Sequence, residues 1–177
     1  MNDGLCRRGA VVVFAVAVVS LLMSGCGWHL RGYGGASLQH RTIYLRVPAD
    51  QPRLAAALRR GLRAAGASLA SDVKSADAVV EVESPRIGRR ASTFSTAARV
   101  EEYELSYGLP FRVLGPKGQP WGPRQVVTDT RTYPYDTKNV LSSQSQERQL
   151  RLEMAEEVAN LLVGRVQAVI NRHETAQ

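Results

Sequence analysis

The chain has 177 residues, of which 44% are apolar, so it is long enough for one domain with a real hydrophobic core. It carries 23 Lys and Arg against 16 Asp and Glu, a net charge of +7. Its three histidines, His29, His40 and His173, are too scattered to indicate a zinc site or a Ser-His-acid triad, and it has no nucleophile elbow, Walker loop or dinucleotide fingerprint.

The first 25 residues have the pattern of a secretory signal peptide. Arg7 and Arg8 precede an apolar run over residues 10–23, and a small pair follows at 24–25. The run is shorter than the roughly 20 residues that a membrane span needs, so we expect residues 1–25 to be removed. Export then excludes nucleic acid as the partner of a chain that keeps a net charge of +6.

Cys26 follows the small pair directly. The order aliphatic, small, Gly, Cys resembles a bacterial lipobox, with Met23 where that pattern usually has Leu, and it makes Cys26 the expected lipidated first residue of the mature chain. Cys6 leaves with the signal peptide, so an intramolecular disulfide is impossible. The alternative is ordinary cleavage that leaves Cys26 free or disulfide-bonded. Gly27, in place of the Asp common in inner-membrane lipoproteins, favours the outer membrane.

Residues 26–40 are rich in glycine and are predicted to be a tether. Apolar and polar residues then alternate over 41–47, which predicts a strand that ends at Pro48. A helix is expected from Pro52 to Gly66. Its polar face could bind phosphates or simply be solvated, and we favour solvation; this face carries Arg53, Arg59, Arg60 and Arg63.

A second strand is predicted over 78–84, where Val80 and Val82 alternate with glutamates. The next segment, 86–99, has no acidic residue and one aromatic, Phe94. Its four basic residues are Arg86, Arg89, Arg90 and Arg99. Such a segment suits either a binding site for a phosphorylated amphiphile or a solvated edge strand.

The strongest strand pattern covers residues 103–113. A turn at 115–118 and a Val- and Thr-rich partner at 121–135 complete a predicted antiparallel hairpin. Alternation places Glu102 and Glu104 on the solvated side, so we expect no acid-base pair from them.

A second helix is predicted over 142–172, with Ser143 or Ser145 as its cap and a Glu147–Arg151 pair one turn apart. Residues 173–177 are expected to fray. This helix is expected to cover the sheet with one stripe, on or near which lie Met154, Val158, Leu161, Leu162, Arg165 and Val169.

These elements predict an α+β fold with a single domain over 41–172. The expected architecture is a two-layer sandwich, a mostly antiparallel sheet with two helices packed on one face. We expect no enzyme, cofactor or metal. The basic surface either meets the phosphorylated lipids of the cell envelope or only maintains solubility.

The segments in this order resemble the LptE family of lipopolysaccharide-assembly lipoproteins. The run Cys-Gly-Trp-His-Leu-Arg-Gly at 26–32 carries most of the resemblance, because family members commonly have Cys-Gly-aromatic-His-Leu-Arg-Gly there. It continues at 58–62, from 92–94 to 102–103, through the hairpin, and into the last helix with Met154.

The resemblance implies an outer-membrane lipoprotein, anchored on the periplasmic side, that plugs the β-barrel LptD and contacts lipopolysaccharide through basic residues. Arg99 matches a basic family position, and Phe94 the aromatic before it. Family members often carry a basic residue near 142–144, where this chain has Ser-Ser-Gln and offers Lys138 earlier. The expected lipopolysaccharide-binding set is therefore Arg86, Arg89, Arg90, Phe94, Arg99 and Lys138.

The alternative function is an envelope lipoprotein that binds a lipid or glycan ligand without a barrel partner.

Overall fold

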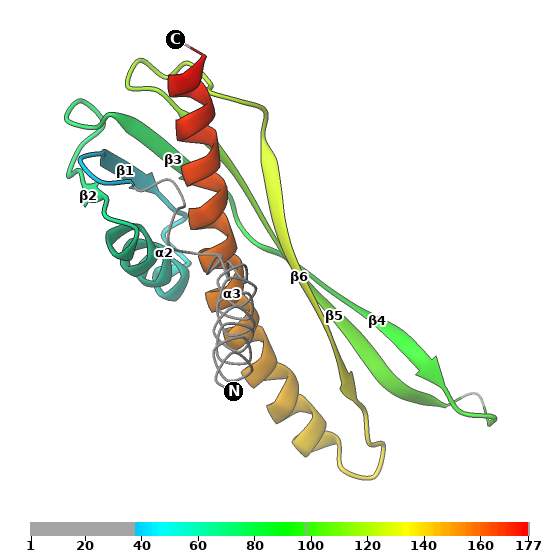
Figure 1. Cartoon of the computed structure of the whole chain (residues 1–177). Helices are drawn as coiled ribbons and strands as arrows, with labels where there is room; N and C mark the ends of the chain where they lie inside the picture. Colours follow the sequence, from blue (N-terminus) through cyan, green and yellow to red (C-terminus); the bar gives the residue numbers. More distant parts are fainter. Residues whose placement is uncertain (1–37, 98, 177) are drawn as a thin grey trace, which may run out of the picture. The chain divides into compact units, whose positions relative to one another are not determined.

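The computed structural model describes residues 38–97 and 99–176, so the predicted signal peptide, Cys26 and most of the tether lie outside the described residues. Residues Ala36–Gln177 form one compact unit. Its elements in chain order are β1 (Thr42–Arg46), α2 (Pro52–Ala64), β2 (Ser68–Leu69), β3 (Ala78–Val82), β4 (Arg86–Phe94), β5 (Val100–Leu114), β6 (Gln125–Pro134) and α3 (Val140–Thr175) (Figure 1).

The sheet is mixed, and antiparallel pairings predominate, which confirms the predicted α+β class. β1 pairs in parallel with β2 and β3, whereas β5 pairs antiparallel with β3, β4 and β6. β3 pairs with the end of β5 and β4 with its earlier part, so both lie along one edge of β5. Pro85, which lacks a donor for the ladder, separates them.

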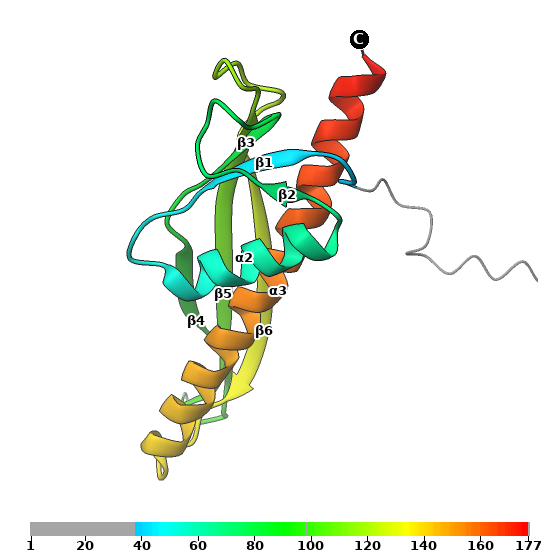
Figure 2. The same cartoon turned by 90° about the vertical axis from the view of Figure 1, so that its left-hand side faces the viewer.

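Both helices cover the same face of the sheet (Figures 1 and 2). The alternate β5 residues from Leu105 to Val113 are buried under them, as period-two patterning predicts. α3 contributes apolar residues four apart, including Met154, Val158 and Leu162, while α2 contributes Leu54, Leu58 and Leu62. The core of the described residues therefore lies between one sheet face and two helices.

Two expectations for the last helix are wrong. Leu161 and Arg165 are exposed, because the buried stripe steps through Leu162 and Val166 instead. α3 begins at Val140, earlier than predicted, and its cap is Asn139, whose side chain accepts a hydrogen bond from the Ser142 N–H. A helix that starts two residues earlier needs its cap before Val140, so neither Ser143 nor Ser145 serves.

Candidate functional site

The sheet ends in a tip formed by two loops. We use this name for residues 94–99, apart from 98, and residues 135–141. The last pairs of β5 and β6 include Tyr103 with Tyr133, and the Tyr135 N–H donates to the Glu101 carbonyl at 2.8 Å. The β4–β5 connection and the β6–α3 loop therefore lie at the same end of the molecule (Figure 1).

Large apolar side chains are exposed at the tip. Phe94 ends β4 with 59% of its surface accessible, and Leu141 in the first turn of α3 has 77% accessible. Val140 beside it is also exposed. Exposed apolar groups gathered at one end of a fold indicate a contact surface.

The side chains of two cations at the tip form no ion pair within the described part of the chain. Arg99 and Lys138 form no ion pair with any described residue, although their backbone N–H groups donate to Ser95 Oγ at 3.2 Å and Asp136 Oδ1 at 2.8 Å. Unpaired cations beside exposed apolar side chains suit a molecule that has both phosphates and acyl chains.

Arg89 belongs to a cluster around Glu147, although 46% of its own side chain is exposed. Its guanidinium donates to Glu147 at 3.1 Å and lies 4.5 Å from the ring centre of Tyr103. Tyr133 donates its hydroxyl proton to the same carboxylate at 2.5 Å, and Arg151 donates to the other oxygen. We call these four side chains, Arg89, Tyr133, Glu147 and Arg151, the Glu147 cluster; it joins β4, β6 and α3.

The titration of this cluster follows from its contacts. Burial opposes the ionisation of Glu147, but hydrogen bonds from Tyr133, Arg89 and Arg151 outweigh it and lower the pKa of the carboxyl. Burial, together with the hydrogen bond to Glu147, raises the pKa of Tyr133 to about 12. Glu147 is therefore an anion at neutral pH that two arginines neutralise.

The other expected arginines of β4 lie in different settings. Arg90 makes two hydrogen bonds to Glu104, at 2.7 and 2.9 Å, and these lower the pKa of Glu104. Glu102 accepts a hydrogen bond from Thr93 at 2.8 Å. Both of these β5 glutamates therefore bind side chains of the neighbouring strand β4. Arg86 begins β4 eight residues before Phe94, about 26 Å away along an extended strand, and so lies outside the tip.

The structure thus places Phe94, Arg99 and Lys138 in the two loops at the same end of the sheet and assigns Arg89 and Arg90 to ion pairs. The exposed apolar pair at 140–141 was not predicted from the sequence. Its signal was two consecutive apolar residues directly before the predicted helix. Within the part of the chain that is described, no cluster of His, Cys, Asp and Glu could hold a metal ion, and no described helix is long and apolar enough to cross a membrane.

The sequence model of the LptE family, described as "Lipopolysaccharide-assembly", matches residues 40–166. The LPS-assembly lipoprotein LptE of Pectobacterium atrosepticum is 26% identical over 172 residues, which cover 94% of this chain and 90% of that protein.

Solved structures share the fold. Rare lipoprotein B from Shewanella oneidensis superposes with a TM-score of 0.66 at 19% identity and covers 75% of this chain and 98% of its own. Lipoprotein B from Nitrosomonas europaea gives 0.68 at 20% identity and covers 81% and 94%. At these identities the likeness establishes the fold alone.

Proposed function

This chain belongs to the LptE family, a non-catalytic family of lipopolysaccharide-assembly lipoproteins, and from that premise we propose that its tip binds lipopolysaccharide while the domain plugs an LptD-type β-barrel. In this proposal Cys26 carries the lipid anchor, and the protein acts on the periplasmic side of the outer membrane. The other expected binding residues, Arg86, Arg89 and Arg90, lie along β4 and contribute less to this site.

The tip is the observation that carries the lipopolysaccharide part. Arg99 and Lys138 offer cations that no described carboxylate neutralises, and Phe94 and Leu141 offer apolar surface beside them. Lipid A presents phosphates and acyl chains together, so one ligand would contact both kinds of side chain. Arg89 and Arg90 already neutralise Glu147 and Glu104, and we assign them a smaller share.

The test compares lipopolysaccharide binding by the mature wild type with that of Arg99→Glu, Lys138→Glu and the double variant. Each reversal removes a charge-assisted contact, so we expect about tenfold weaker binding per site at low salt. Arg63→Glu is the matched control, because Arg63 is an exposed arginine at the far end of α2. Equal affinities of the double variant and Arg63→Glu at low salt, where screening is weak, would reject the tip as the site.

The barrel partner needs its own test. If the domain plugs an LptD-type barrel, affinity purification of the lipoprotein from detergent-solubilised envelopes recovers a large β-barrel in stoichiometric amount. Recovery of the lipoprotein without any barrel would favour the alternative, a lipid- or glycan-binding lipoprotein that acts alone.

A further inference from the structure

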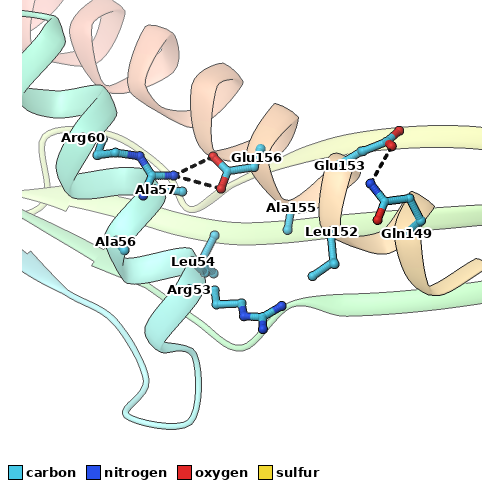
Figure 3. Close-up of a pocket in the computed structure, with 10 residues that line it drawn as sticks. All are labelled: Arg53, Leu54, Ala56, Ala57, Arg60, Gln149, Leu152, Glu153, Ala155 and Glu156. Carbon is cyan, nitrogen blue, oxygen red and sulfur yellow. Dashed lines mark hydrogen bonds and ion pairs between the residues drawn. The ribbon is translucent and has the colours of Figure 1, made fainter.

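A groove lies between residues 53–60 of α2 and residues 149–156 of α3, away from the close contact of the two helices at Gly61. It has a volume of about 390 Å³, within the usual size range of ligand pockets. Its aliphatic lining comes from Leu54, Ala56 and Ala57 on α2 and from Leu152 and Ala155 on α3 (Figure 3). We propose that this groove binds one acyl chain of lipopolysaccharide, with Arg53 contacting a phosphate.

The apolar lining fits an acyl chain. Leu152 has 44% of its surface exposed, although a leucine at a helix–helix junction could have been buried. The small side chains of Ala56, Ala57 and Ala155 do not fill the space between the two helices at this point, and so they leave a groove. An inserted acyl chain would remove this apolar surface from water.

Among the charges of the rim, Arg53 remains available to an anionic head group. Arg60 pairs with Glu156 at 2.9 and 3.0 Å, and Glu153 accepts hydrogen bonds from Gln149 at 3.0 Å and Arg131 at 3.4 Å. Arg53 is the one charged side chain of the lining that forms no ion pair with a described residue.

Arg53 is also placed to meet a head group. The first turn of α2 contains no acidic residue that could neutralise the charge of Arg53. Its side chain extends from α2 toward α3 beside Leu152 (Figure 3). A ligand that lays its acyl chain along Leu152 would bring a phosphate to this guanidinium, which pairs well with phosphate oxygens.

The groove would be a second contact site for the ligand of the proposed function. The proposal rests on that function only for the choice of lipopolysaccharide as the ligand. The groove and the tip share no residue. Their variants therefore test the two ideas separately.

The experiment uses the mature chain with Cys26→Ala, which lacks the anchor but keeps all described residues and their core. Calorimetry measures binding of decyl and dodecyl phosphate below their micellar concentrations, with dodecyl maltoside as the uncharged probe. We expect each added methylene to tighten binding about fourfold, as burial in an apolar site requires.

Matched variants locate the binding. Leu152→Glu should weaken dodecyl phosphate binding at least tenfold, while Leu161→Glu, an exposed leucine on the same helix with 42% of its surface accessible, should change it less than twofold. Arg53→Glu should weaken dodecyl phosphate but not dodecyl maltoside, while Arg59→Glu, on the same helix and outside the groove, should change neither. Equal effects of Leu152→Glu and Leu161→Glu would overturn the proposal.

Competition identifies the natural ligand. Lipopolysaccharide should displace dodecyl phosphate from the wild type; displacement by phosphatidylglycerol vesicles alone would overturn lipopolysaccharide as the occupant. If Arg99→Glu with Lys138→Glu abolishes lipopolysaccharide binding and the groove variants leave it unchanged, the groove proposal fails while the proposed function stands. If the groove variants weaken binding and the tip variants do not, the tip assignment fails instead.

Discussion

Glu147 is a carboxylate of α3 that accepts hydrogen bonds from three side chains. The spacing of Glu147 and Arg151 predicts an i to i+4 pair on a helix, and the structure confirms the pair. The carboxylate is nevertheless buried, because Arg89 and Tyr133 reach it from two strands. Arg89 lies 58 residues away in the chain, so no local pattern could have joined it to Glu147. Pairings of this kind depend on sheet register.

Removal of this buried anion should destabilise the domain. Glu147→Ala leaves two guanidiniums and the Tyr133 hydroxyl without their acceptor, so we expect a loss of about 2–3 kcal/mol in the free energy of unfolding at pH 7. Urea denaturation measures it. Glu157→Gln, an exposed glutamate on the same helix, should change the value by less than about 0.5 kcal/mol.

The same carboxyl makes stability depend on pH. Its pKa in the folded protein lies below the ordinary value of 4.5, so its contribution is complete above that pH and is lost as the pH falls through the folded pKa. Glu147→Gln should therefore flatten the acid limb of the stability curve relative to the wild type. Parallel curves for the two proteins between pH 6 and about pH 3 would contradict this assignment.

At the scale of elements, period and turn chemistry predicted most of the fold. The alternation over 103–113 identified β5, and the apolar spacing after Pro52 identified α2. The two-residue β2 was missed because so short a strand has no period to detect. The parallel pairing of β1 with β3 was also not predicted, since it depends on which strands become neighbours after the α2 crossover.

The start of α3 gives a direct check on capping. Asn139→Ala removes the side chain that accepts from the Ser142 N–H, so we expect about 1 kcal/mol less stability. Ser145→Ala is the control, because Ser145 is an exposed residue inside the helix that accepts a hydrogen bond from the Arg148 side chain. Thermal unfolding distinguishes the two variants. A larger effect of Ser145→Ala would support Ser145 as the cap, as the sequence analysis allowed.

The packing of α2 against α3 depends on Gly61. A Cβ atom at this position would lie 3.0 Å from Val163 Cγ2, so Gly61→Leu should force the helices apart and cost about 2 kcal/mol. Gly164 on α3 has open space around it, and Gly164→Ala should instead stabilise the domain by about 0.5–1 kcal/mol through helix propensity. If Gly61→Leu causes no loss of stability in chemical denaturation, the helices do not meet at Gly61.

For the whole molecule, sequence and structure contribute different parts of the account. The run at 26–32 indicated the family, but it lies outside the described residues. The structure contributes the tip, because the exposure of Phe94 and Leu141 and the absence of described ion pairs at Arg99 and Lys138 follow only from the arrangement of two loops. Charge composition could not separate these cations from the arginines that neutralise glutamates.

Photo-cross-linking in living cells tests the central claim most directly. A photoreactive phenylalanine analogue would replace Phe94 or Leu141 at the tip, and Arg63 as the control. If the tip meets lipopolysaccharide inside a barrel, both tip positions yield adducts with lipopolysaccharide and with a large β-barrel protein, and position 63 yields no lipopolysaccharide adduct. The account would be contradicted if the tip positions yield no lipopolysaccharide adduct, or if position 63 yields as much of it as the tip.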